Sequence, residues 1–472
     1  MSPLRVIVSG MASLLLLAGC GTFTTLAPQS KPTAPEQWTA ISIPDGSVMG
    51  WLDDFDQGKV LRALVDEAVG NNYDLATAVA RVKQSSARAR IAGADLLPQA
   101  GVTVTGSRSQ RLRGSNFDKI TANQFSTNFD ISWEIDLWGR LRNLKSSTLA
   151  DLRAAQADYQ AARLSLATRV VSTVLNLVES RQQAEVSRQT LTSLRTNLDI
   201  LDAKLEAGDV DDRTALEITL SRADVLRTEA TLAANERQAD AFKRVLEGLL
   251  GRYPDGTIQG LTDFPQVKRQ VSAGLPSELL LRRPDLIAAE QRVLAATEDV
   301  RASWKALLPN FTINAGAGTS TTDKFSDLLD PKALVWDLAG RLGQAVFQGG
   351  RLVAGVELSK AQLEEIASRY AETALRAFRE VETALAAEGF YRDQQRKLEG
   401  AVEQANLAEE LALGQYEKGL VDIITVLESQ RRAFDARSNL LRVRNERLQN
   451  RLDLYLALGG DFDHGPNLAV KS

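Results

Sequence analysis

The residue types that most often carry chemistry are scarce in this sequence. A single cysteine, Cys20, and a single histidine, His464, lie near opposite ends of the 472-residue chain. One thiol cannot form an internal disulfide, and a Ser–His–Asp arrangement would depend on one histidine close to the C-terminus. The sequence contains no Cys–His cluster and no phosphate-binding loop. It therefore predicts a protein that is not an enzyme, with no catalytic residues and no metal or other cofactor.

Cys20 itself stands in a context that predicts a modification. Arg5 is followed by an apolar run centred on Leu14 to Leu17, and small residues precede the cysteine. This pattern predicts a signal peptide over residues 1–19. Leu17-Ala18-Gly19-Cys20 resembles the bacterial lipobox, which implies a palmitate-type lipid on Cys20 (S-diacylglycerol and an N-acyl chain). An ordinary signal peptide with an incidental cysteine is the alternative.

The residues after Cys20 bear on where the chain is anchored. Gly21 follows the cysteine, instead of the Asp that retains such lipoproteins at the inner membrane, so the lipobox resemblance implies the outer membrane of a Gram-negative bacterium. Residues 20–54 are rich in Thr, Ser and Pro near their start and predict an extended tether.

The carboxylates that could do chemistry in the body of the chain lie on one alternating stretch. From Gln124 to Leu137 polar and mostly apolar residues alternate, which predicts a β-strand with two unlike faces. Such a strand fits either a soluble core or a membrane barrel with lipid outside and water inside. In a barrel, the lumen-facing carboxylates would favour cations; they are Asp130, Glu134 and Asp136. The lipid-facing side chains would be Phe125, Phe129, Ile131, Trp133, Ile135 and Leu137.

Composition argues against two classes of protein. Charged residues make up 25% of the chain and the net charge is −4, which is no electrostatic footprint for nucleic acid. No run of eighteen apolar residues follows residue 20, which disfavours a helical membrane span.

Helices flank the alternating stretch. The periodicity over 55–97 predicts a helix that ends at Pro98. Between Gly139 and Gly208 lie 68 residues without Gly or Pro, and a helix of that length spans about 100 Å. A further helix is predicted to about Leu250, so two helices of half length could stack end to end beside the long one.

The chain then repeats itself with a shift of 211 residues. Leu96-Leu97-Pro98 matches Leu307-Leu308-Pro309, and Gly139-Arg140-Leu141 matches Gly350-Arg351-Leu352. We therefore predict a mainly α-helical fold with membrane β-strands, built from two copies of helix, β-hairpin, long helix, turn and helix. The predicted parts are a first repeat at 55–250 with its hairpin at 99–138, a connector at 251–284, a second repeat at 285–460 with its hairpin at 309–348, and a tail at 461–472.

Two hairpins give four strands, which cannot close a barrel. The smallest membrane barrels have eight strands, so several chains would have to share one, and three chains would supply twelve. The alternative is a soluble four-stranded sheet covered by helices. That alternative does not explain the carboxylates on one face, the lipid anchor or the length of the helices.

These features together resemble the TolC-like outer membrane factors, and within them the OprM/NodT-type efflux lipoproteins. The resemblance rests on the lipobox, the repeat, both hairpins, the stretch Gly274-Leu275-Pro276-Ser277-Glu278-Leu279-Leu280-Leu281-Arg282-Arg283-Pro284-Asp285 and the stretch from Tyr416 to Arg432. It implies a homotrimer whose 12-stranded outer-membrane β-barrel continues into a 12-helix periplasmic α-barrel. It also implies a periplasmic adaptor (membrane fusion) protein and an inner-membrane transporter of the RND type as partners.

The family resemblance also implies roles for the predicted turns. Tyr416, Ile424, Glu428 and Arg431 match positions that constrict the periplasmic end, although the family more often has Asp where this chain has Glu428. The two turns that would dock the adaptor are Gly208, Asp209, Val210 and Gly419, Leu420, Val421. Gly208 and Gly419 are explained equally well if each simply ends a helix, without any role in docking.

The resulting functional prediction is an exit duct of a tripartite efflux pump, which passively conducts small molecules such as drugs. A type I secretion duct of the same fold and a periplasmic coiled-coil scaffold lipoprotein are the alternatives. The lipobox and the Arg-Arg-Pro-Asp sequence favour efflux.

Overall fold

The computed structural model describes residues 34–35, 38–39, 51–55, 59–113, 118–208, 214–266, 276–322 and 324–460. Its first half contains η1 (Trp51–Asp54), α2 (Val60–Asn71), α3 (Tyr73–Ala94), β1 (Gln99–Arg113), β2 (Asp118–Ile135), α4 (Arg140–Glu206) and α5 (Thr214–Leu249). Its second half contains α6 (Pro276–Arg282), α7 (Pro284–Lys305), β3 (Asn310–Thr321), η2 (Phe325–Leu329), η3 (Pro331–Ala333), β4 (Leu334–Gly343), α8 (Arg351–Tyr416) and α9 (Ile423–Ala457). The same order of helices and strands thus occurs twice, which confirms the duplication.

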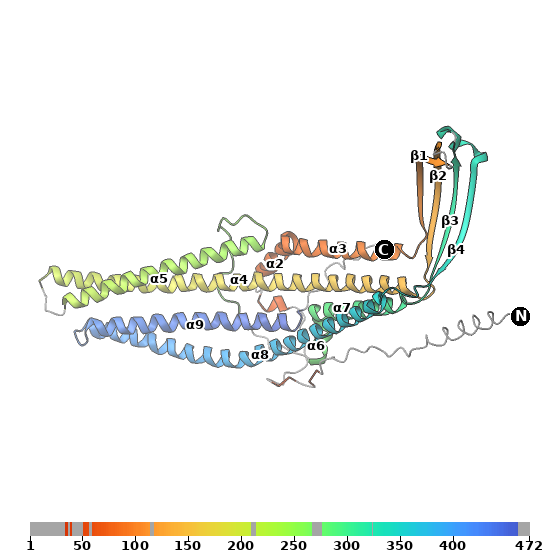
Figure 1. Cartoon of the computed structure of the whole chain (residues 1–472). Helices are drawn as coiled ribbons and strands as arrows, with labels where there is room; N and C mark the ends of the chain where they lie inside the picture. The colour runs from red at the N-terminus through yellow and green to blue at the C-terminus, as the bar shows by residue number, and fades with distance from the viewer. Residues whose placement is uncertain are drawn as a thin grey trace.

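The helices form four parallel columns, which we call lanes (Figure 1). The long helices α4 and α8 each make one lane. The half-length helices stack end to end in pairs, α3 with α5 in one lane and α7 with α9 in another. The lane of α3 and α5 packs on α4, α4 packs on the lane of α7 and α9, and that lane packs on α8. The sheet stands at one end of the lanes and the helix turns lie at the other, as expected.

The strands of the described residues form one antiparallel sheet in the order β1-β2-β3-β4. β2 and β3 lie in the middle and join the two repeats, while β1 and β4 are edges. β4 is exposed along almost its whole length. Both edges therefore offer unpaired backbone groups to another strand.

Two predicted boundaries were wrong. The helix predicted over 55–97 breaks at Asn72, whose extended backbone (φ −71°, ψ 127°) ends α2 and whose side chain caps α3. The alternating strand starts earlier than predicted, at Asp118, and ends at Ile135, so Leu137 lies beyond it. The chain leaves the sheet there because Gly139, at φ 78°, turns it into α4.

The main core sits near the middle of the lanes, where the stacked helices meet. It is formed by fully buried side chains from the N-terminal segment and every lane, among them Trp51, Phe55, Leu61, Leu175, Leu250, Leu286, Leu385 and Leu452. By length and composition α4 could cross a membrane, but 61% of its most apolar window is buried, so it serves as a core helix. A second, smaller core near the turns joins α4, α5, α8 and α9.

Candidate functional site

The strand register sorts the side chains of the sheet onto two faces, because residues paired across antiparallel strands share a face. Phe129 pairs with Val102 on one side and with Ala317 on the other, and Ala317 pairs with Trp336. The apolar face continues along all four strands and includes Val102, Val104, Phe125, Phe129, Ile131, Trp133, Ile135, Phe311, Ile313, Leu334, Trp336, Leu338 and Leu342. Near the far end of the sheet, Phe125 packs edge-on against Phe325 of η2.

The opposite face is polar and holds a carboxylate that the sequence did not reveal. Asp130 pairs with Gly316, and Gly316 pairs with Asp337. A Cβ on Gly316 would lie 2.7 Å from Asp337 Oδ1 and 3.5 Å from Asp130 Oδ1, so both carboxylates lean over the glycine. Asn128 also donates a hydrogen bond to Asp130. The sequence does not predict this position of Asp337 because the alternation of β4 is weak. Only the strand register shows on which face of the sheet Asp337 lies.

Glu134 lies on the same polar face but is not a free carboxylate. The Arg140 guanidinium donates two hydrogen bonds to it, at 2.8 and 3.0 Å. Both side chains are about 30% exposed. This ion pair ties the lower end of β2 to the first turn of α4.

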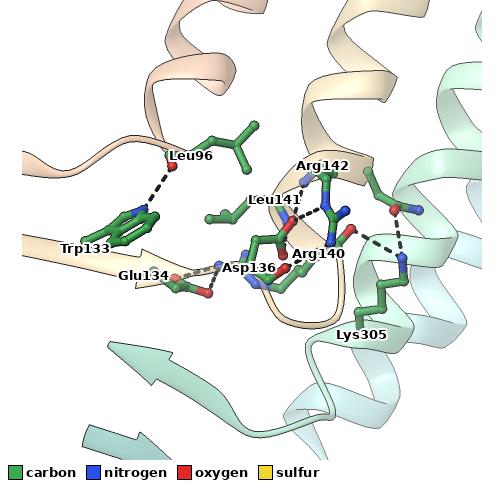
Figure 2. A network of polar contacts seen from close by, with 10 residues as sticks. Leu96, Trp133, Glu134, Asp136, Arg140, Leu141, Arg142 and Lys305 are labelled. Atoms are coloured by element: carbon green, nitrogen blue, oxygen red, sulfur yellow. Dashed lines mark hydrogen bonds and ion pairs between the residues drawn. The ribbon is translucent and has the colours of Figure 1, made fainter. Parts of the chain in front are cut away.

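Asp136 does not line water as predicted. Its side chain is only 8% exposed and accepts hydrogen bonds from the backbone N–H groups of Leu141 and Arg142, at 3.1 and 3.0 Å (Figure 2). Burial raises the pKa of Asp136, but these N–H groups and the Arg142 guanidinium outweigh burial and lower it overall. The carboxylate therefore stabilises the N-terminus of α4, where the helix presents unpaired donors.

Matching contacts attach the sheet to the helices in both repeats. Trp133 Nε1 donates to the Leu96 carbonyl at 3.0 Å, and Gln344 Nε2 donates to the Leu307 carbonyl at 3.1 Å. Trp133 and Gln344 are 211 residues apart, as are Leu96 and Leu307. Lys305 of α7 adds a bond between repeats, donating to Asn143 Oδ1 at 2.8 Å (Figure 2).

At the other end of the lanes, the structure places the four predicted constriction residues near one turn but does not bring them all together. Tyr416 ends α8, and the Lys204 ammonium donates to its hydroxyl at 3.2 Å while lying 4.8 Å from the ring centroid. Glu428 pairs with Arg431 and Arg432 of its own helix. Hydrogen bonds from these arginines and their charges lower the pKa of Glu428. Ile424 is 43% exposed.

The turns themselves are closed by glycine. Gly208 and Gly419 have φ of 73° and 72°, and Leu420 N donates to the Gln415 carbonyl at 2.9 Å, which closes the end of α8. Leu420 is 71% exposed and Val421 is half-buried. The other predicted site residues Asp209, Val210 and Cys20, together with His464, lie outside the described residues. Within the described ranges, no group of three or more His, Cys, Asp and Glu is arranged to hold a metal ion.

Comparison with known proteins gives consistent matches along the chain. The family model "Outer membrane efflux protein" matches residues 64–252 and 275–460. The pyoverdine export outer membrane protein OpmQ of Pseudomonas putida is 34% identical over 465 residues, which cover 95% of this chain and 96% of that protein. The outer membrane protein OprJ of Pseudomonas aeruginosa is 29% identical, with 98% of each chain covered. A crystal structure of a membrane protein from Pseudomonas aeruginosa superposes with a TM-score of 0.85 at 29% identity, covering 94% of this chain and 99% of that one.

The family model covers well over half of the chain, and the relatives align from end to end. The two-faced sheet, the stacked lanes and these matches have one explanation. The chain belongs to the outer membrane efflux protein family and is a non-enzymatic channel in the outer membrane of a Gram-negative bacterium, serving efflux pumps.

Proposed function

We propose that three copies of the chain close one twelve-stranded barrel and form the exit duct of a tripartite pump. The observation that carries this proposal is the sheet, which has one apolar face, one polar face and two free edges. Pairing β4 of one copy with β1 of the next satisfies both edges and leaves none exposed to lipid. The polar face then lines the lumen and the apolar face contacts the membrane.

The height of the apolar face supports this arrangement. On β2 the apolar face extends from Phe125 to Ile135, a span of ten residues. At about 3.4 Å per residue and a tilt of about 40°, this length covers about 26 Å across the membrane, close to the ~25 Å apolar band of outer-membrane barrels.

The packing of the helices supports the same trimeric assembly. The lanes of α3 and α5 and of α8 are the outer two, and each packs mainly on one other lane. α8 exposes large apolar side chains, including Leu375 at 61% and Phe390 at 76%. Contact between α8 of one copy and the α3–α5 lane of the next would bury these side chains and make a tube of twelve lanes.

The turn end of the tube is the proposed gate and docking end. Three copies would place the exposed Ile424 in an apolar ring and Glu428 in a carboxylate ring. The Lys204–Tyr416 contact links the tip of α4 to the tip of α8 and holds this end together. The tips Gly208–Val210 and Gly419–Val421 are the proposed contacts for a periplasmic adaptor, which connects the duct to an inner-membrane transporter of the RND type.

Lipidation of Cys20 fits the position of the next described residues. Trp38 packs edge-on against Phe378 of α8 with ring centroids 6.3 Å apart, and Thr39 N donates to Glu382 at 2.7 Å. Phe378 lies 27 residues along α8, about 40 Å from its start beneath the barrel. The 18 residues from Cys20 to Trp38 reach at most about 60 Å, so a lipid on Cys20 can enter the membrane while Trp38 stays docked.

The decisive test is whether membranes of a producing strain contain the assembled duct. We expect heat-modifiable trimers in outer-membrane fractions, metabolic labelling by palmitate that Cys20→Ala abolishes, and increased drug susceptibility after deletion. Monomers in the soluble periplasmic fraction would refute the barrel and support a scaffold. If deletion abolished the export of a protein and left the drug susceptibility of the strain unchanged, the result would support a type I secretion duct.

A further inference from the structure

A group of basic side chains lies directly beneath the barrel, and the efflux function gives it no role. It consists of Arg90 of α3, Lys145 and Arg142 of α4, and Lys305 of α7, which we call the basic collar. All four lie within the last two turns before the strands or the first two turns after them. The chain as a whole has a net charge of −4, so the positive charge of the basic collar is opposite in sign to that of the whole chain.

The side chains of the collar are gathered by two glycines. Lys305 Nζ and Arg142 Nη2 lie 3.2 and 3.5 Å from the position of a Cβ on Gly139. The stem of Lys145 crosses Gly93, with Cε 3.5 Å from the position of a Cβ there. Arg90 is one turn from Gly93 on the same side of α3. Three helices therefore bring these cations to the same end of the lanes, next to the sheet.

These charges are poorly neutralised within the chain. Arg142 is paired with Asp136, but Lys305 donates only to the neutral Gly139 carbonyl and the Asn143 amide oxygen, at 3.3 and 2.8 Å. Neither the Lys145 ammonium nor the Arg90 guanidinium makes a hydrogen bond or ion pair in the described part of the chain. Asp95, at the end of α3, is the neighbouring exposed carboxylate.

The two collar residues of α4 face away from the channel. Arg140 bonds Glu134 on the polar face of the sheet and so points toward the lumen. At 100° per residue, Arg142 and Lys145 lie about 160° and about 140° from Arg140 around α4, on the opposite side. Leu137 and Trp138, 55% and 47% exposed, lie just above them. An exposed Trp beside apolar side chains is typical of the membrane–water interface.

The level of the collar matches the lipid phosphates. The apolar face ends at Ile135, and Lys145 lies six residues beyond Gly139, about 9 Å along α4. In the proposed barrel α4 leaves the membrane toward the periplasm, which places Lys145 at the headgroup region of the inner leaflet. We propose that the basic collar binds the phosphate groups of anionic phospholipids in the periplasmic leaflet of the outer membrane. This inference rests on the barrel proposed above.

The test compares lipid retention by full-length trimers in nanodiscs of mixed phosphatidylcholine and phosphatidylglycerol. The variant Arg90→Gln/Lys145→Gln removes two charges that make no hydrogen bond or ion pair in the described part of the chain. The control Arg392→Gln/Lys397→Gln removes one exposed Arg and one exposed Lys, about 60–70 Å along α8 from its start near the collar. Native mass spectrometry counts the phosphatidylglycerol molecules that stay bound.

Wild type and control should retain phosphatidylglycerol above its bulk fraction, and 0.5 M salt should lower that retention. Near a membrane surface each basic residue contributes about fivefold in affinity, so the collar variant should fall close to the bulk fraction. Equal retention by collar variant and wild type would overturn the proposal. So would a collar variant whose trimers dissociate at lower temperature while lipid retention stays the same, since that would assign the cations to contacts between copies. Absence of trimers in every sample would instead refute the barrel.

Discussion

Asn72 and Arg283 occupy equivalent positions in the two repeats, and each joins the end of one helix to the start of the next helix in its lane. Asn72 Nδ2 donates to the Leu249 carbonyl at the end of α5, at 3.0 Å, and its Oδ1 accepts from the first turn of α3. Arg283 donates to the Ala457 carbonyl at the end of α9, at 3.2 Å, and to Asp285 in the first turn of α7. A neutral amide in one repeat thus does what a guanidinium does in the other.

The two junctions should differ in how much they stabilise the fold. The Arg283 side chain is 9% exposed and also donates to Glu380 at 2.7 Å, so Arg283→Ala leaves Asp285 and Glu380 without their cation. Asp285 and Glu380 are 36% and 40% exposed, so water partly solvates the charges left behind, and the loss should be about 2–3 kcal/mol in the free energy of unfolding, below that of a fully buried pair. Asn72→Ala removes a cap and one further hydrogen bond and should cost about 1–2 kcal/mol. Thermal unfolding of detergent-solubilised protein, followed by circular dichroism, measures both.

Arg282→Ala is the matched control for the first prediction. Arg282 is the neighbouring residue, half exposed, and pairs with Glu278 on the same helix. Such pairs contribute less than about 1 kcal/mol. If Arg283→Ala were no more destabilising than Arg282→Ala, the junction would not depend on the Arg283 contacts.

Much of the fold was predictable because it depends on long, regular patterns. The 68 residues without Gly or Pro between Gly139 and Gly208 predict α4 closely, and the shift of 211 residues transfers that prediction to α8. The alternation around Phe129 predicts β2 and its two faces, and the register extends those faces to all four strands.

What could not be predicted depends on contacts between distant residues. Asp136 continues the alternation of β2, yet its carboxylate caps α4, because the chain turns at Gly139 and brings the helix start back to it. The break at Asn72 is not predicted by the sequence because the helical pattern continues through it. The interruption is explained by the nearby end of α5, to which the Asn72 side chain donates a hydrogen bond. Asp337 has no sequence signal that relates it to Asp130.

Glu179 should make the stability of the protein depend on pH. It lies between α4 and α9, half-buried, and accepts a hydrogen bond from Asn445 Nδ2 at 2.6 Å. Burial raises the pKa of Glu179 above its usual value of 4.5, and the Asn445 bond offsets only part of that. The folded state therefore binds the proton of Glu179 more tightly than the unfolded state does. The contribution of Glu179 to the free energy of unfolding is fully present below pH 4.5 and is lost as pH rises through the raised pKa.

Glu179→Gln removes the charge and keeps an oxygen that accepts from Asn445. The variant should therefore unfold at a higher temperature than wild type at pH 8, and the difference should shrink as pH falls toward 4.5. Circular dichroism melts across this range provide the measurement. A difference that is constant with pH would mean that burial does not perturb the Glu179 carboxyl.

The periplasmic end should open more readily when its polar contacts are removed. Tyr416→Phe removes the hydroxyl that accepts from Lys204 of α4, and Arg431→Leu removes a cation beside the proposed Glu428 ring, so that its carboxylates repel one another more strongly. In planar bilayers the double variant should show a severalfold higher single-channel conductance than wild type. Tyr391→Phe, higher on α8, serves as the control for loss of a hydroxyl. Equal conductance in all three proteins would remove these residues from the gate.

Asp130 and Asp337 should make the barrel prefer cations, because their carboxylates lie side by side over Gly316 on the face proposed to line the lumen. Three copies would carry six such carboxylates at one level, and a ring of negative charge attracts cations and repels anions. Asp130→Asn/Asp337→Asn should move the permeability ratio of K⁺ to Cl⁻ toward unity, as measured by the reversal potential across a KCl gradient.

A variant with the opposite change makes this test directional. Ser132 is exposed on the same polar face, one level from Asp130, so Ser132→Asp adds a carboxylate and should increase the preference for K⁺. High salt should weaken both shifts, since mobile ions screen charges in a water-filled lumen over about 10 Å at 0.1 M and about 3 Å at 1 M. An anion-selective wild-type channel, or shifts of the same sign in the two variants, would show that this face of the sheet does not line the conducting path.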